Sequence, residues 1–171
     1  MKLALVTALA VLVGTGSAAH AITVTKKRDM PGEASAVWAL VGDFCAIKNW
    51  HPLVANCVLS RQGDVTYRTL TFRDGSTAKE RLTGTEETSY SYELIESQLP
   101  VKNYKATLSV EEDEDYPDRS EVHWEASFDV QDTSEKEGRT RIAEILEAGV
   151  LAKTRRVTSK IAAMSFASFQ K

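Results

Sequence analysis

The sequence is poor in the residue types that build metal sites and nucleophilic active sites. Its 171 residues include three histidines and two cysteines. His20 lies near the N-terminus and strand alternation turns His123 outward, which leaves His51 alone for an internal site. A metal cluster needs several ligands close together, and no cysteine stands at a recognisable catalytic spacing from a histidine. We therefore predict neither a metal nor another cofactor.

Signals for nucleotides and nucleic acids are missing as well. The chain has no glycine-rich phosphate loop and no Gly-x-Ser-x-Gly nucleophile motif. Its formal net charge is −3, and its basic residues form no stripe, so nucleic acid is not an expected partner. The acidic segment 111–118 lacks the ligand spacing and central glycine of a calcium loop, and is interpreted as a solvated loop.

No apolar run is long enough to span a bilayer comfortably. Lys2 precedes an apolar run from Leu3 to Val13, and Ala19-His20-Ala21 fits the small-residue pattern of a signal-peptide cleavage site. We expect residues 1–21 to be a signal peptide cleaved after Ala21, and residues 22–171 to form one periplasmic or secreted domain. An uncleaved anchor is the alternative. After cleavage, no stable membrane insertion is expected.

The two cysteines, Cys45 and Cys57, leave two interpretations open. An exported protein can hold a disulfide, and this one would close a loop of about a dozen residues and stabilise the fold by about 3 kcal/mol. Alternatively, both thiols are buried as small hydrophobic side chains. Spacing alone does not decide, because a bridge requires that the side chains meet.

The remaining pattern predicts one α+β domain with an antiparallel meander. Two short helices, 33–41 and 43–50, follow the first strand, and Asp74-Gly75 marks a tight turn. A long helix of about 25 residues starts near the capping box Ser134-x-x-Glu137, with Arg141 off its apolar stripe. The segment Met164 to Phe169 is either packed or disordered. The expected strands are 22–28, 56–61, 65–72, 76–83, 89–97, 103–111 and 120–130.

Three polar side chains fall on the apolar faces of these strands. Alternation places Arg68, Glu80 and Tyr104 in phase with aliphatic and aromatic neighbours. Buried polar groups are costly unless they pair or serve a ligand. Together they indicate a cavity with a few polar groups inside apolar walls, which is typical of small-molecule sites. The aromatic residues Tyr92, Trp124 and Phe72 also have inward phases and are candidate ligand contacts, although most such residues belong to the core.

The trio of Arg68, Glu80 and Tyr104 has a catalytic and a structural interpretation. In an enzyme, Glu80 would transfer a proton, Arg68 would hold an anionic or carbonyl oxygen, and Tyr104 would donate or orient. In the structural interpretation, Arg68 and Glu80 form a buried ion pair and Tyr104 satisfies a spare lone pair.

The order of elements and one sequence segment resemble the SRPBCC superfamily of START, Bet v 1 and polyketide-cyclase proteins. The segment is Val37-Trp38-x4-Asp43-Phe44-x2-Ile47-x2-Trp50-His51-Pro52-x4-Cys57. The chain is most similar to the bacterial polyketide cyclase/dehydrase and MxaD-like branch. This resemblance implies a helix-grip fold, in which a curved antiparallel sheet of about seven strands wraps around the long C-terminal helix. In that fold Trp50 and His51 lie near the cavity mouth, which adds them to the ligand candidates.

The sequence is similar also to plant lachrymatory-factor synthase. The functional Arg, Glu and Tyr of that enzyme match Arg68, Glu80 and Tyr104, but it has an aromatic residue in place of His51. Three functions therefore stay open: binding a small hydrophobic or amphipathic molecule, proton-transfer catalysis on such a molecule, and an MxaD-like accessory role with a protein partner in a periplasmic dehydrogenase system. An interior too full for a few heavy atoms would remove both ligand hypotheses.

Overall fold

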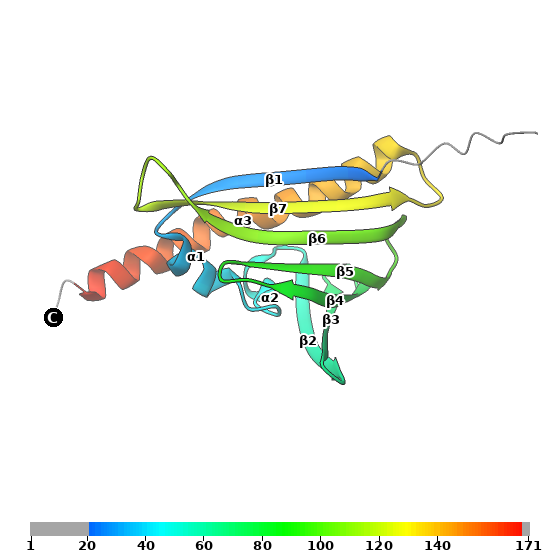
Figure 1. Cartoon of the computed structure of the whole chain (residues 1–171), viewed down its shortest axis with the longest axis horizontal. Coiled ribbons are helices and arrows are strands. Elements are labelled where there is room, and N and C mark those ends of the chain that lie inside the picture. Colours follow the sequence, from blue (N-terminus) through cyan, green and yellow to red (C-terminus); the bar gives the residue numbers. More distant parts are fainter. Residues whose placement is uncertain (1–20, 169–171) are drawn as a thin grey trace, which may run out of the picture.

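The computed structural model describes the backbone of residues 21–168 and the side chains of residues 21–151. The described chain forms a seven-stranded antiparallel sheet and three helices, and the predicted α+β helix-grip arrangement is confirmed (Figure 1). The elements are β1 (Ile22–Pro31), α1 (Ala34–Val41), α2 (Ile47–Trp50), β2 (Val54–Gln62), β3 (Val65–Phe72), β4 (Thr77–Thr85), β5 (Ser89–Ser97), β6 (Val101–Glu112), β7 (Arg119–Val130) and α3 (Glu135–Ser168).

The sheet order is β1-β7-β6-β5-β4-β3-β2. Six strands form the predicted meander, while β1 pairs with β7 over its full length, from Ile22 opposite Phe128 to Pro31 opposite Arg119. Figure 1 shows these two strands side by side. The pairing explains why β1 runs three residues further than alternation predicts, because a continuous partner strand supplies hydrogen bonds to the end.

Interruptions of the ladder lie beside two residues of the trio. The β4–β5 register shifts between Lys79 and Glu80, and the β6–β7 register shifts between Lys102 and Lys105. Within the second irregularity, Asn103 has a φ of 54°. Bulges bend a strand and re-aim the neighbouring side chains. They therefore set the directions in which Glu80 and Tyr104 point.

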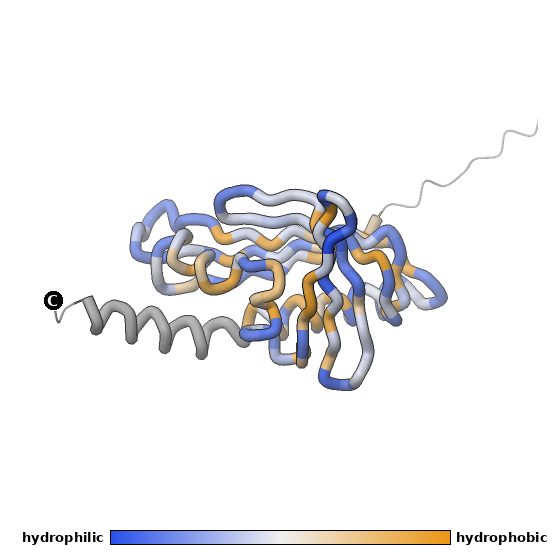
Figure 2. Tube along the Cα trace, turned by 90° about the horizontal axis from the view of Figure 1, so that it is seen from below, coloured by the Kyte–Doolittle hydropathy of each residue, from blue (hydrophilic) through white to orange (hydrophobic). Residues whose placement is uncertain are grey.

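The core lies between one face of the sheet and the helices. Ile142, Leu146 and Val150 of α3 are buried, as the predicted stripe requires, and α3 packs against β1, β7 and α2. At Gly149 an added Cβ would lie 2.4 Å from Trp124 Cζ3 and closer than 3 Å to His51, so glycine permits this close approach. Figure 2 shows the hydrophilic colours concentrated at the turns between strands.

The helices differ from the sequence pattern at two places. Residues 43–46 form turns, and α2 begins at Ile47, because the Asp43 carboxylate accepts a hydrogen bond from the Cys45 amide (2.9 Å). Helix α3 spans 34 residues where the sequence pattern predicts about 25, since neither glycine nor proline interrupts it after Gly149. Its N-terminus has the predicted capping box, with the Ser134 amide donating to Glu137 Oε2 (3.2 Å) and the Glu137 amide donating to Ser134 Oγ (3.3 Å).

Residues 1–20, which make up nearly all of the predicted signal peptide, lie outside the described residues, as does Phe169. The side chains of residues 152–168, which include the later part of the predicted apolar stripe and the start of the segment from Met164, are also outside them. Among the described helices, none combines the length and the apolar character needed to cross a membrane.

A disulfide joins Cys45 to Cys57, with a Cα–Cα distance of 5.6 Å. This settles the two interpretations of the cysteines in favour of the bridge. It ties the turn between α1 and α2 to strand β2, which is an edge of the sheet.

Candidate functional site

Arg68 and Glu80 face each other on adjacent strands at the centre of the candidate site. They are direct partners in the β3–β4 register, and Arg68 Nε donates a hydrogen bond to Glu80 Oε2. Arg68 is fully buried and Glu80 is 7% exposed. The alternation that predicted both side chains to be internal is therefore confirmed, and the pair forms the buried ion pair of the structural interpretation.

The rest of the Arg68 guanidinium is enclosed by aromatic residues. Nη1 donates to the Phe44 carbonyl and, at 3.3 Å, to Tyr90 Oη. The Phe44 ring centroid lies 4.1 Å from Cζ and the Tyr92 centroid 4.8 Å, distances at which cation–π attraction operates. Among the described residues, Nη2 has no hydrogen-bond partner. Burial is the largest single effect on the pKa of Arg68 and opposes the charged form. The Glu80 carboxylate, together with Tyr90 and Tyr92, outweighs burial and raises this pKa, so the buried cation stays charged.

Two neutral phenols lie beside this ion pair. Trp124 Nε1 donates to Tyr92 Oη at 3.0 Å, and the Tyr92 and Tyr104 rings are 6.3 Å apart. Burial, and then the negative charge of Glu80, raise the pKa of Tyr104. The pKa of Tyr92 is raised well above its ordinary value, again mainly by burial. Both hydroxyls therefore stay protonated at neutral pH.

Most of the predicted site residues line one small inner cavity. Its volume is about 30 Å³, room for about two water molecules. Glu80, Tyr104, Tyr92, Trp124, Phe72 and His51 all line it. Arg68 and Trp50 are not part of this lining. Arg68 instead contacts Glu80 from the side, and buried Trp50 packs edge-on against Trp124, with ring centroids 5.6 Å apart.

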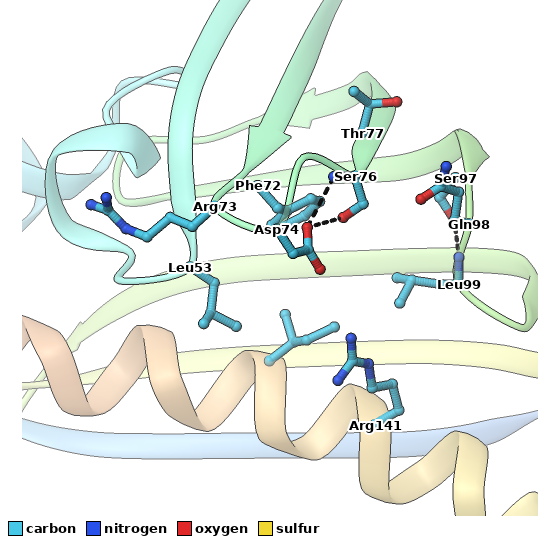
Figure 3. A pocket seen from close by; sticks show the side chains of 11 residues that line it. Leu53, Phe72, Arg73, Asp74, Ser76, Thr77, Ser97, Gln98, Leu99 and Arg141 are labelled. Atoms are coloured by element: carbon cyan, nitrogen blue, oxygen red, sulfur yellow. Dashed lines mark hydrogen bonds between the residues drawn. The ribbon is translucent and has the colours of Figure 1, made fainter.

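A much larger outer pocket, of about 570 Å³, lies next to the inner cavity. It opens between the β3–β4 turn, the β5–β6 connection and α3, as Figure 3 shows. Phe72, Leu99 and Ile145 line both spaces and stand where they meet. The other lining residues are Leu53, Arg73, Asp74, Ser76, Thr77, Ser97, Gln98 and Arg141.

The sequence pattern identifies only Phe72 of the outer pocket. Arg141 falls outside the predicted apolar stripe, yet it lines the pocket together with Ile145. Residues four apart lie on one face of a helix, so the spacing of Arg141 and Ile145 is the signal that locates it.

His51 connects the turn after α2 to helix α3. Its Nδ1 accepts a hydrogen bond from the Leu53 amide (3.2 Å), which leaves Nε2 to donate to the Ile145 carbonyl (3.1 Å). His51 is only 2% exposed, so its ring is enclosed between this turn and the helix. The ring fixes the position of Ile145, one of the residues between the two cavities.

The buried phenols predict loss of stability at high pH. Burial raises the pKa of Tyr90, Tyr92 and Tyr104, so the native state keeps protons that the unfolded chain releases above about pH 10. Their contribution is complete below about pH 10 and is lost as the pH rises further, by up to about 1.4 kcal/mol per pH unit for each tyrosine. Urea unfolding at a series of alkaline pH values measures this slope.

Two phenylalanine variants give the matched comparison. In Tyr104→Phe, the free energy of unfolding should fall less steeply with pH than in the wild type, because one of the three buried tyrosines no longer contributes. Tyr116 is 55% exposed, so Tyr116→Phe should leave the slope unchanged. Equal slopes in the wild type and in Tyr104→Phe would contradict the raised pKa.

The fold and the paired cavities define the class, a helix-grip protein of the START-like group. A family model described as polyketide cyclase/dehydrase and lipid transport matches residues 21–158. The chain belongs to this family. No curated protein matches the sequence.

Solved structures agree with this assignment. The protein XoxI from Bacillus cereus is 29% identical, with a TM-score of 0.71 over 76% of this chain and 91% of that one. A START superfamily protein from Mycobacterium smegmatis is 17% identical, with a TM-score of 0.66 over 80% and 97% of the two chains. The Zhui aromatase/cyclase from Streptomyces sp. R1128 is 13% identical, with a TM-score of 0.64 over 82% and 93%. The last two similarities show the fold alone. The likenesses to MxaD and to lachrymatory-factor synthase stay predictions.

Proposed function

We propose that this protein is exported and binds a small, largely hydrophobic molecule between the sheet and helix α3. The outer pocket carries the proposal, because its volume of about 570 Å³ falls in the range of small-molecule sites. Leu53, Phe72, Leu99 and Ile145 supply apolar walls to it. Covering these walls with a ligand removes apolar surface from water, which is favourable.

Export is supported by two independent features. The N-terminal segment has the sequence pattern of a signal peptide. The Cys45–Cys57 disulfide fits the oxidising environment of the periplasm or the cell exterior, where such bonds persist.

The sizes of the two cavities favour binding over catalysis. Glu80 and Tyr104 line only the inner cavity, and about 30 Å³ is too small for a few heavy atoms. The interior around Arg68, Glu80 and Tyr104 is therefore too full for a ligand, and the ligand hypothesis rests on the outer pocket. The second candidate function is a proton-transfer enzyme. It is favoured because the Glu80 carboxyl and the Tyr104 phenol line the same cavity. For a substrate to reach them from the outer pocket, Phe72, Leu99 or Ile145 would have to move aside.

Native mass spectrometry of protein purified from its own periplasm tests the binding function. We expect an adduct of a few hundred daltons, on the order of what a pocket of this size encloses. Leu53→Trp should weaken it, because Leu53 lines the pocket and the larger ring would take space from the ligand. Leu59 is similarly exposed (50% against 42%) but lies outside the pocket, so Leu59→Trp should keep the adduct. An adduct equally abundant in both variants would overturn the assignment to this pocket.

A further inference from the structure

The outer pocket carries excess positive charge on a protein whose net charge is negative. Arg73, Asp74 and Arg141 are the charged residues of its lining, which gives two cations against one anion. The whole chain has a formal net charge of −3. A cationic pocket on an acidic protein concentrates anions locally.

The bonding of these three residues differs. The Asp74 carboxylate accepts hydrogen bonds from the Ser76 hydroxyl (2.6 Å) and the Ser76 amide (2.9 Å), which keep the pKa of Asp74 below its usual value, with a smaller contribution from the charge of Arg141. Arg73 Nε donates to the Pro52 carbonyl (2.7 Å). Among the described residues, no hydrogen bond or ion pair within 4 Å engages Arg141, even though Glu137 and Glu144 lie beside it along α3.

The position of Arg141 sets the geometry of a ligand. Figure 3 shows its side chain rising from α3 toward the space between the β3–β4 turn and Leu99. Ile145, one helical turn further along, lines both the outer pocket and the inner cavity. A molecule held at one end by Arg141 therefore extends over Ile145 and Phe72 toward the inner cavity.

We infer that the ligand is an amphipathic organic acid, with its carboxylate on Arg141 and its apolar body along Leu53, Phe72, Leu99 and Ile145. The planar guanidinium offers two parallel N–H donors that match the two oxygens of a carboxylate. The surplus of one positive charge suits a monoanion, whereas Asp74 repels a dianion such as a phosphate monoester. This inference rests on the proposed binding function and names its ligand class.

Three ten-carbon probes distinguish the ligand classes: decanoate, decanol and decyl phosphate, titrated into the purified full-length mature protein by calorimetry below their aggregation concentrations. We expect decanoate to bind about tenfold more tightly than decanol, the scale of a hydrogen bond to a charged group. Decyl phosphate should bind more weakly than decanoate. Arg141→Gln should remove the advantage of decanoate and leave the affinity for decanol unchanged.

Arg139→Gln is the control, because it removes the same charge from the same helix. Arg139 bonds to the Thr23 carbonyl and does not line the pocket, so this variant should keep the preference for decanoate. Wild-type protein that binds decanol as tightly as decanoate, or Arg141→Gln protein that keeps the preference, would overturn the ligand class but not the binding function. Tighter binding of decyl phosphate would assign a phosphate head group instead. Failure of all three probes to bind would overturn the binding function itself.

Discussion

Replacing Arg68 with alanine is expected to lower the free energy of unfolding by about 3–5 kcal/mol, the usual cost of removing one partner of a buried ion pair. The Glu80 carboxyl, at a site that is 7% exposed, would lose the guanidinium that now donates to it. The Phe44 carbonyl would lose its donor, and the space among the Phe44, Tyr90 and Tyr92 rings would be left empty. Urea unfolding followed by tryptophan fluorescence measures the loss.

Two control variants separate charge from packing. Arg68→Met combined with Glu80→Leu removes both charges and keeps much of the volume, so it should be far more stable than Arg68→Ala. Glu80→Gln is nearly isosteric and should stay folded. If the protein is an enzyme, Glu80→Gln should lower turnover by about 100-fold, whereas binding of a neutral ligand should hardly change. Wild-type stability in Arg68→Ala would show that the ion pair does not hold the site together.

Removing the disulfide by Cys45→Ala combined with Cys57→Ala is expected to cost about 3 kcal/mol, because the bridge closes a short loop and restricts the unfolded chain. The effect should extend to the site. Phe44 precedes Cys45, and its carbonyl accepts a hydrogen bond from Arg68, so the bridge holds this carbonyl over the guanidinium.

Unfolding with and without a reducing agent checks this prediction. The wild type should lose stability when dithiothreitol is added, while the double alanine variant should be insensitive to it. Equal midpoints for the oxidised wild type and the double variant would contradict a stabilising bridge.

Alternation and turn residues are enough to predict the meander, because each strand buries one face and therefore repeats with period two. The same argument places Arg68, Glu80 and Tyr104 inside the fold, and all three are buried. Alternation does not predict the pairing of β1 with β7, since the period of a strand carries no information about its neighbour.

Local patterns do not reveal the outer pocket, because four separated segments build it. Its walls come from the α2–β2 turn, the β3–β4 turn, the β5–β6 connection and one face of α3, and no single period links them. The hydrogen bonds of Arg68 to Phe44 and Tyr90 are equally hidden, since they join residues more than twenty positions apart. Burial can be predicted from the strands, whereas cavity size depends on how side chains fill the space.

The pairing of the first strand with the last has a consequence for the order of folding. Ile22 meets Phe128 only after more than a hundred intervening residues are available. Contacts between distant segments form slowly, because loop entropy is lost before they give any stabilisation. A nascent chain that has not yet supplied β7 holds a five-strand meander with β6 as an open edge. Such an edge can pair with another chain, so the protein is most exposed to misassembly in the interval before β7 joins the sheet.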